Sequence, residues 1–222
     1  MCESRPVPLI HHITHIEHLP RIIAEGALVC DAGAARRNLS SKSIAYGAIK
    51  ERRAVTPVQN LKGEPIAAGG MLCDYVPFYF CNRSPMLGAI YKRNIDDASV
   101  MQRDVIYLVS STEAVAKTDL TWCFTDGHAI EGFTEFYDDY NDLPKVDWKA
   151  VDTWRWGGRW LDKDPDVKRR KQAEFLVHDR FPWELVERIA VMDEPMMRQV
   201  VALLERARRR PRVTIEPKWY YD

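Results

Sequence analysis

The stretch Tyr75-Val-Pro-Phe-Tyr-Phe80 decides the fold class of this chain, together with the similar stretch Val105-Ile-Tyr-Leu-Val109. Both consist mainly of β-branched and aromatic residues, which are typical of strands. Ser84-Pro85 follows the first stretch and predicts a helix, because serine caps the free amides of a first turn and proline fits its first position. Strands that alternate with short helices indicate an α+β fold.

The C-terminal part of the chain continues this alternation. Phe181-Pro182 and Glu194-Pro195 each place a proline where a helix would begin. The elements predicted here are a helix over 183–188, a buried strand over 189–192, a helix from Glu194 with Met197, Val200, Val201 and Leu204 on one apolar face, and an exposed strand over 212–216. The sequence contains no internal repeat, and its length suits a single domain over residues 1–222.

Composition restricts the class of protein. The chain has 222 residues, 46% of them apolar, and 32 Lys and Arg residues balance 32 Asp and Glu residues. These values exclude a disordered chain and a histone-like basic protein. No apolar run approaches the ~20 residues that cross a membrane, and the first ten residues lack the pattern of a secretion signal. Five scattered cysteines favour a reducing compartment, so we expect a soluble, cytoplasmic protein.

Two segments are predicted to be loops. Residues 60–70 contain three glycines and a proline. Residues 125–166 contain Asp138-Asp139, Gly157-Gly158 and four tryptophans. Long loops in a compact domain are usually functional or disordered, and the tryptophans argue against disorder. We therefore expect a folded, partly mobile loop that lies over a site.

The net charge of zero conceals two oppositely charged segments. Residues 36–53 carry six basic side chains and one acidic one, whereas residues 131–147 carry six acidic side chains and one basic one. Such runs are most often solvated surfaces, but a basic run can also neutralise nucleic-acid phosphates. Aromatic residues of the long loop, among them Phe133, Phe136 and Tyr137, could then stack on bases.

Four of the six histidines lie close together in His11-His-Ile-Thr-His15-Ile-Glu-His18. Imidazole is a common zinc ligand, but no later H-x-x-x-H or C-x-x-C pair supplies further ligands, so we expect no metal. The alternation instead predicts a strand with His12 and Thr14 on one face and Ile13 on the other. These two polar side chains could hydrogen-bond a ligand, or the segment could be an ordinary surface strand.

Two charged residues are candidates for catalysis. Tyr46 and Arg53 share one face if residues 46–53 are helical, so Arg53 could clamp a phosphate or be an ordinary surface arginine. Glu174 stands at the start of an apolar strand, where a charge needs a reason to be buried. It could bind a ribose hydroxyl and stabilise a developing cation, act as a general base, or form a structural salt bridge with an arginine.

Seven segments follow one another over nearly the whole chain. They are His12-Ile-Thr-His-Ile16 with Leu19-Pro-Arg-Ile-Ile23 and Gly26, Ser43-Ile-Ala-Tyr46 with Arg52-Arg53, Asp74-Tyr-Val-Pro-Phe-Tyr-Phe80, Arg83-Ser-Pro-Met-Leu87, Phe124-Thr-Asp-Gly-His128, Gln172-Ala-Glu-Phe-Leu-Val177 and Trp219-Tyr-Tyr221. In this order they resemble the DarT family, the DNA ADP-ribosyltransferase toxins of bacterial toxin–antitoxin pairs. The stretch Arg155-Trp-Gly-Gly-Arg-Trp160 departs from the family pattern.

The resemblance implies an ADP-ribosyltransferase-like fold, with a split mixed β core flanked by short helices around a cleft for NAD. It implies NAD as co-substrate, no metal, an NAD-binding segment around 35–53, and a loop around 125–174 that presents the substrate. The residues it implies are Glu174 and Arg53 for catalysis, His12, Ile13, Thr14, Tyr46, Arg53, Tyr79 and Met86 for NAD, and His128, Arg83 and Tyr137 for substrate DNA.

The implied reaction moves ADP-ribose from NAD onto a base of single-stranded DNA, expected to be thymidine, and releases nicotinamide. The enzyme classes expected are glycosyltransferase and nucleotidyltransferase. The implied partner is a macrodomain antitoxin that reverses the modification, and no membrane is involved. The alternatives are a catalytically silent module that binds NAD or nucleic acid, a protein-directed ADP-ribosyltransferase, and a metal-dependent nuclease built on the N-terminal histidines.

Overall fold

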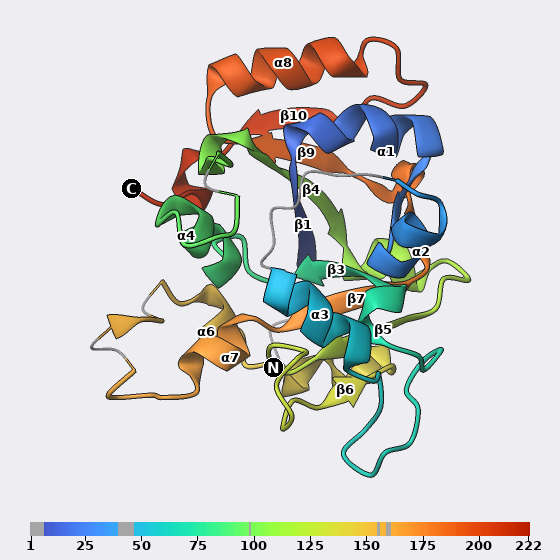
Figure 1. Cartoon of the computed structure of the whole chain (residues 1–222), viewed down its shortest axis with the longest axis vertical. Coiled ribbons are helices and arrows are strands. Elements are labelled where there is room, and N and C mark those ends of the chain that lie inside the picture. Colours follow the sequence, from blue (N-terminus) through green and yellow to red (C-terminus); the bar gives the residue numbers. More distant parts are fainter. Residues whose placement is uncertain (1–6, 40–46, 98, 155, 159–160) are drawn as a thin grey trace, which may run out of the picture.

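A mixed eight-stranded sheet forms the centre of the molecule in the computed structural model, which describes residues 7–39, 47–97, 99–154, 156–158 and 161–222. Its strands are β1 (Leu9–His15), β3 (Tyr75–Tyr79), β4 (Val105–Ser111), β5 (Trp122–Thr125), β6 (Phe136–Tyr137), β7 (Glu174–His178), β9 (Arg188–Val191) and β10 (Arg212–Ile215). Their order is β10-β9-β4-β1-β3-β7-β5-β6, and in Figure 1 the sheet runs from β10 at the top to β6 at the bottom. β9 and β10 are parallel, and the other neighbours are antiparallel. A separate antiparallel pair consists of β2 (Ala27–Val29) and β8 (Arg180–Pro182).

Short helices surround the sheet. They are α1 (Leu19–Glu25), α2 (Asp31–Arg36), α3 (Gly47–Val55), α4 (Pro85–Tyr91), α5 (Thr112–Ala116), α6 (Trp148–Asp152), α7 (Val167–Lys171) and α8 (Glu194–Leu204). The 3-10 turns are η1 (Ile16–His18), η2 (Leu72–Asp74), η3 (Gln102–Asp104), η4 (Tyr140–Lys145), η6 (Trp183–Leu185) and η7 (Pro217–Trp219). In Figure 1, α8 lies along the β9–β10 end of the sheet, and α1 and α2 lie across the view from α4. Among the helices of the described ranges, none has the length and apolar character needed to cross a membrane.

The sheet opens between β1 and β3, which pair at one position, His11 with Tyr79. β1 pairs with β4 along its whole length of seven residues, so the opening lies on one side of β1. Pro77 of β3 has no N–H to donate, and its carbonyl oxygen accepts a hydrogen bond from His12 Nδ1 at 2.8 Å. His11 Nδ1 donates to the Tyr79 carbonyl oxygen at 3.2 Å. Imidazole rings thus replace backbone pairing, which gives the split core that the resemblance implies.

Several elements predicted from the sequence are confirmed. Ser84 caps α4 by accepting from the Leu87 N–H, and α8 begins at Glu194 as its proline predicts. The strands expected over 189–192 and 212–216 are β9 and β10, each within one residue at either end. In β1, His12 and Ile13 lie on opposite faces, as predicted. Ile10 and Ile16, at even positions like His12, pack in one apolar cluster, whereas Ile13 packs in a second cluster that contains Leu87.

The helix expected over 183–188 is wrong. Phe181 instead belongs to β8 and pairs with Leu28 of β2, and the helical geometry that follows is limited to the 3-10 turn η6. The Trp183 N–H donates to the Gly26 carbonyl oxygen at 2.9 Å. The Trp183 N–H is therefore satisfied by a residue far along the chain, whereas Pro182 taken alone predicts that this N–H belongs to the first turn of a helix.

The long loop is more regular than the sequence predicts. Residues 125–166 include β6, η4 and α6, so the expectation of a segment without regular structure is wrong in part. Trp148 packs edge-on against Phe80 at 5.2 Å, and its Nε1 donates to the Leu143 carbonyl oxygen. These contacts attach the segment to the main core. Residues 60–70, by contrast, form turns with isolated bridges, as their glycines predict.

Candidate active site

Glu174 is the first residue of β7, and 2% of its surface is exposed. Its carboxylate accepts from the Ala129 N–H at 3.1 Å through Oε1 and from Arg53 Nη1 at 2.9 Å through Oε2. Its own N–H donates to Thr125 Oγ1 at 3.0 Å, and the Thr125 hydroxyl donates to the Gly127 carbonyl oxygen at 2.6 Å. Each carboxylate oxygen has a donor, which permits a buried negative charge at this position.

Arg53 belongs to the last turn of α3, and its side chain is 9% exposed. Its Nη2 donates to the Leu72 carbonyl oxygen at 3.3 Å, so two partners fix the guanidinium. The helix predicted over 46–53 is confirmed from Gly47 onwards, while Tyr46 lies outside the described residues. The salt bridge considered for Glu174 is present, and its arginine is the other residue that the resemblance assigns to catalysis.

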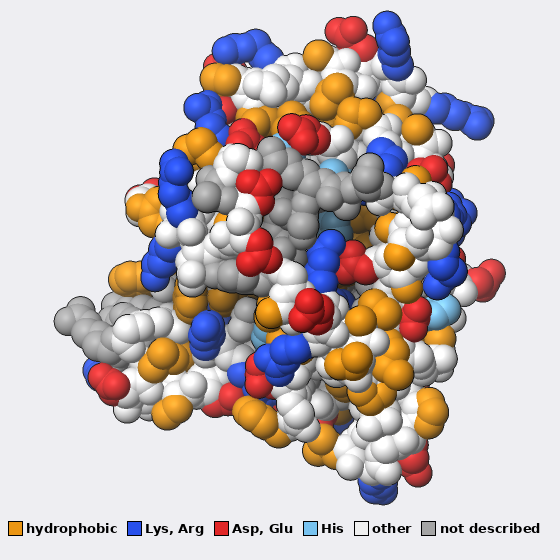
Figure 2. Space-filling model, in the orientation of Figure 1, with side chains coloured by type: hydrophobic (Ala, Val, Ile, Leu, Met, Phe, Trp, Pro, Cys, Tyr) orange, Lys and Arg blue, Asp and Glu red, His pale blue; other side chains and the backbone are white. Residues whose placement is uncertain are grey.

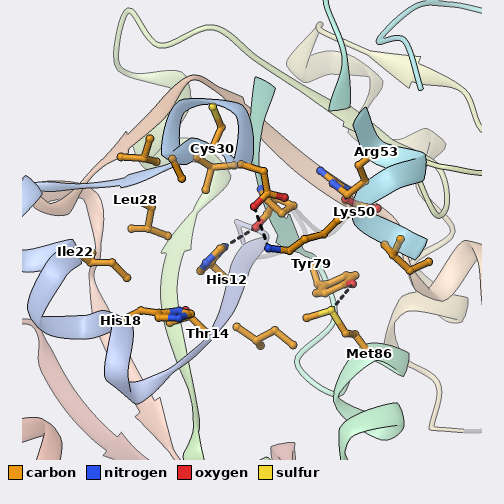
Figure 3. A pocket seen from close by; sticks show the side chains of 18 of the residues that line it. His12, Thr14, His18, Ile22, Leu28, Cys30, Lys50, Arg53, Tyr79 and Met86 are labelled. Carbon is orange, nitrogen blue, oxygen red and sulfur yellow. Dashed lines mark hydrogen bonds and ion pairs between the residues drawn. The ribbon is translucent and has the colours of Figure 1, made fainter. Parts of the chain in front are cut away.

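A cavity adjoins the Glu174–Arg53 pair and is lined from β1, β2, β3 and α3. Its open space is about 1110 Å³ when the mouth, which is continuous with solvent, is included. Of the residues predicted to bind NAD, the cavity wall contains His12, Ile13, Thr14, Arg53, Tyr79 and Met86. In Figure 3, His12 and Thr14 project from β1, and Lys50 and Arg53 project from α3 on the other side of the same space.

His12 presents an uncharged ring to this cavity. Burial lowers the pKa of His12, which keeps the imidazole neutral at pH 7. Its Nδ1 carries the proton because a carbonyl oxygen, here that of Pro77, can only accept. The other ring nitrogen, Nε2, is therefore an acceptor that a ligand hydroxyl or amide can use.

A second cavity adjoins the first. Both are lined by Ile49, Tyr79, Met86 and His128. Its remaining wall includes the cations Arg52, Lys168 and Arg169 and the ring of Phe133. Burial, followed by the Glu174 charge, raises the pKa of Tyr79, and burial lowers the pKa of His128. Both groups are therefore uncharged at pH 7 where the two cavities meet.

The structure does not bring Arg83 and Tyr137 to either cavity. The Arg83 guanidinium lies 4.4 Å from the centre of the Tyr221 ring and lines a different cavity. Tyr137 stacks on Phe124 with 5.4 Å between ring centres, and its hydroxyl donates to Glu135. Of the three residues implied for DNA, only His128 lies beside the Glu174 site, and a role in DNA binding for the other two stays a prediction.

The basic segment 36–53 is largely neutralised by acidic residues from elsewhere. Ion pairs join Arg36 to Asp179, Arg37 to Glu25, Lys50 to Asp31, Arg52 to Glu131 and Arg53 to Glu174, while Lys42 lies outside the described residues. The Arg52–Glu131 pair, at 3.7 Å, links the two oppositely charged segments directly. Figure 2 shows basic and acidic side chains interspersed over this face. Most of the positive charge predicted to neutralise phosphates is therefore already paired with carboxylates of the same chain.

The N-terminal histidines do not converge. His11 and His12 bond to separate carbonyl groups of β3, the His15 ring accepts from the Glu17 N–H, and His18 is hydrogen-bonded to Thr14. Within the described ranges, no group of three or more His, Cys, Asp or Glu side chains is arranged to hold a metal ion.

Sequence reasoning missed two groups that hold Glu174. Ala129 contributes a backbone N–H, for which no side chain gives a signal. Thr125 lies within the quoted segment Phe124-Thr-Asp-Gly-His128, but its hydrogen bond to a residue 49 positions away follows from the pairing of β5 with β7.

Comparison with known proteins tests the family resemblance that the sequence shows. A family model described as "ssDNA thymidine ADP-ribosyltransferase, DarT" matches residues 11–221. A DNA ADP-ribosyl transferase of Thermus sp. (strain 2.9) is 40% identical over 218 residues, 97% of each chain. The structure of Thermus sp. 2.9 DarT in complex with ADP-ribosylated ssDNA has a TM-score of 0.88 at 39% identity and covers 98% of each chain. Its complex with NAD+ has a TM-score of 0.85 at 36% identity over 98% of this chain and 99% of that one. The predicted fold and enzyme class are confirmed, and the chain belongs to the DarT family of single-stranded-DNA thymidine ADP-ribosyltransferases.

Proposed function

We propose that the chain transfers ADP-ribose from NAD to the thymine base of thymidine in single-stranded DNA and releases nicotinamide. The observation that carries this proposal is the buried Glu174–Arg53 pair beside Tyr79 and His128, which line two adjoining cavities. A transfer reaction needs room for two substrates that meet at one carboxylate. The similar Thermus DarT has been solved with NAD+ and with ADP-ribosylated ssDNA.

The first cavity is the proposed NAD site. His12 Nε2 and the Thr14 hydroxyl can hydrogen-bond the sugar and amide groups of a dinucleotide, and Lys50 and Arg53 can bind its pyrophosphate. α3 supplies both cations, and both lie within the segment 35–53 that we propose to bind NAD.

Glu174 is the proposed catalytic residue. Nicotinamide leaves with the electron pair of its bond to the ribose, so positive charge develops on that sugar, and an adjacent carboxylate stabilises this state more than the ground state. The base nitrogen loses its proton to solvent and forms the new bond to the same ribose carbon. A carbon–nitrogen bond is exchanged and no bond to phosphorus, so the enzyme is a glycosyltransferase and the term nucleotidyltransferase, also expected from the sequence, is imprecise.

The second cavity is the proposed DNA site. Arg52, Lys168 and Arg169 line it together with Phe133, and cations interleaved with aromatic rings are typical of surfaces that bind single strands. A duplex hides the reacting edge of thymine, so a single strand is the expected substrate. The segment 125–174, which we propose to present the DNA, supplies all of these residues except Arg52.

The test is incubation with NAD and a single-stranded oligonucleotide that contains thymidine. We expect the mass of the oligonucleotide to rise by one ADP-ribose, and Glu174→Gln, which keeps the side-chain size but removes the charge, to abolish the rise. Fragmentation of the product locates the adduct, and an adduct on guanosine would overturn the assignment to thymidine. Binding without turnover would indicate a catalytically silent module. Transfer of ADP-ribose to protein alone would indicate a protein-directed enzyme. Strand cleavage that EDTA abolishes would indicate a metal-dependent nuclease.

We propose further that the chain is the toxin of a bacterial toxin–antitoxin pair. An adduct on a template base blocks base pairing, so its formation should arrest replication. The family resemblance implies a macrodomain partner that removes the adduct, and we propose that the enzyme acts in the cytoplasm, where a bacterium keeps both NAD and its DNA. Expression of the wild type should stop growth, Glu174→Gln should not, and co-expression of the macrodomain protein should restore growth.

A further inference from the structure

Phe133 differs from Phe136 and Tyr137, the other two residues named above for base stacking. Phe136 is buried in the core, and Tyr137 is stacked on Phe124. Phe133, in contrast, is 61% exposed and lines the second cavity. The flat face of this ring is therefore available to a ligand in a concave wall that also carries cations.

Arg169 supports this ring from one side. The centre of its guanidinium lies 4.9 Å from the centre of the Phe133 ring. The same guanidinium is held by Asp166 through two contacts of 2.8 Å and by Asp126 at 3.0 Å. Its side chain is 11% exposed, and these carboxylate partners hold the guanidinium beside the ring. Arg169 therefore acts as a fixed backing for Phe133, which leaves the rest of the ring available.

The backbone that carries Phe133 is also fixed. The Thr134 hydroxyl donates to the His128 carbonyl oxygen at 2.9 Å, and the Thr134 and Glu131 N–H groups donate to the Glu131 and His128 carbonyl oxygens. Phe133 thus belongs to the same hydrogen-bonded turn as His128, which lines both cavities. A ring held in place before binding loses little entropy when a partner stacks on it.

We propose that Phe133 is the stacking platform for the base that neighbours the modified thymidine. The ligand is the flat face of a nucleobase, because an aromatic ring backed by a guanidinium and flanked by the cation Lys168 matches a base and its phosphate. Within the described residues no carboxylate pairs with Lys168, so its charge is available to the strand. This inference rests on the proposed function and adds a contact that determines how the strand is placed.

The test uses single-stranded oligonucleotides with one thymidine target and an abasic residue at each flanking position in turn. The wild type should lose kcat/KM for ADP-ribose transfer by about 5- to 150-fold at one flanking position, the range measured for base–aromatic stacking. Phe133→Ala should show the same loss on the intact oligonucleotide and no further loss when that position is abasic. Phe133→Trp should retain activity, whereas Phe133→Leu, which is apolar but not planar, should not.

Trp154→Ala is the matched control, since Trp154 is also strongly exposed but lines a different cavity and should leave transfer unchanged. Full activity of Phe133→Ala, or losses that multiply at every abasic position, would overturn the platform. Failure of the platform is distinguished from failure of the proposed function by the equilibrium binding of the same oligonucleotides to the Glu174→Gln protein, measured by fluorescence anisotropy. Binding that depends on Phe133 without wild-type transfer keeps the platform and overturns the transferase, and absence of binding overturns both.

Discussion

Thr125 is completely buried and lines neither cavity beside Glu174. Its hydroxyl accepts from the Glu174 N–H and donates to the Gly127 carbonyl oxygen. It therefore joins the strand that carries the carboxylate to the turn whose Ala129 N–H binds that carboxylate. We regard Thr125 as a positioning residue, because it acts through Glu174 and has no access to the substrates.

Thr125→Val tests this role. Valine keeps the volume of threonine but leaves two buried backbone groups without partners, at a cost of about 1–3 kcal/mol. We expect kcat to fall by about tenfold or more while KM for NAD stays the same, since the cofactor contacts are untouched. Thr125→Ser should restore most of kcat. Steady-state kinetics with urea unfolding as a folding check would decide, and an unchanged kcat in the valine variant would refute the role.

The Glu174–Arg53 pair is expected to contribute to the stability of the fold as well as to activity. Arg53→Gln leaves a buried carboxylate without its ionic partner and should lower the free energy of unfolding by about 3–5 kcal/mol. The double variant with Glu174→Gln should lose less than the sum of the two single losses. Urea titration of the four proteins measures the coupling. Additive losses would show that the pair contributes no net interaction.

At the scale of elements, Arg169 of α7 holds the turn 126–134 in place. Its guanidinium bonds to Asp126 and Thr134, and its carbonyl oxygen accepts from the His128 N–H at 3.0 Å. The arginine passes close to Gly127, where an added Cβ would lie 2.2 Å from Nη1. Glycine is needed there because helix and turn approach each other closely.

Gly127→Ala should therefore displace Arg169 and loosen the turn that supplies the Ala129 N–H to Glu174. We expect a loss of stability of about 1–3 kcal/mol, as for other overpacked sites, and a lower rate of transfer to DNA. Gly132→Ala in the same loop is the control, since nothing lies within 4 Å of its added Cβ. Thermal unfolding and transfer assays on both variants would test this, and equal behaviour of the two would count against the close approach.

At the scale of the whole molecule, the split in the sheet is maintained by two imidazole rings, those of His11, which is buried, and His12, which is half-buried. Burial lowers the pKa of His11 to about 4 and also lowers the pKa of His12. In the unfolded chain both would titrate near 6.5. The folded protein thus binds fewer protons than the unfolded chain between these values, and its stability must fall as the pH decreases from 6.5 towards 4.

Protonation of His11 is expected to lower the free energy of unfolding by about 3 kcal/mol as the pH decreases from 6.5 to 4, at roughly 1.4 kcal/mol per pH unit. His11→Phe keeps a ring against Tyr107 and Trp219 but cannot titrate. It should be less stable at pH 7.5, where the bond to Tyr79 is lost, and should show a flatter pH profile. Urea unfolding between pH 7.5 and 4.5 measures both effects. Parallel profiles for the two proteins would contradict the assignment.

The net charge of zero predicts weak general affinity for DNA. The basic segment 36–53 is mostly paired, whereas residues 206–212 contain five arginines, and no carboxylate of the described chain pairs with any of them. Duplex binding should therefore be weak, depend on residues 206–212 and weaken further with salt. Replacing these arginines with serine should remove it and leave transfer at saturating single-stranded DNA intact. Tight duplex binding at physiological salt would contradict this expectation.

Much of the architecture was accessible from local sequence pattern. Strands β3 and β4 follow from their β-branched and aromatic residues, and α4 and α8 from their capping residues and prolines, because these signals act within a few residues. The failed helix over 183–188 shows the limit of such signals. There the pairing of Phe181 with Leu28 outweighs the local preference.

The sequence by itself placed Glu174 at the start of an apolar strand, partly buried if the alternation holds, and Arg53 on one face with Tyr46 if residues 46–53 are helical, because both inferences depend only on neighbouring residues. The tertiary structure alone decided that these two meet, across 121 residues, at 2.9 Å. It also decided that Ala129 and Thr125 hold the carboxylate, and that Arg83 and Tyr137 lie away from the cavities. The reason is that such contacts depend on strand order and on backbone groups, which every residue carries alike and no local pattern distinguishes.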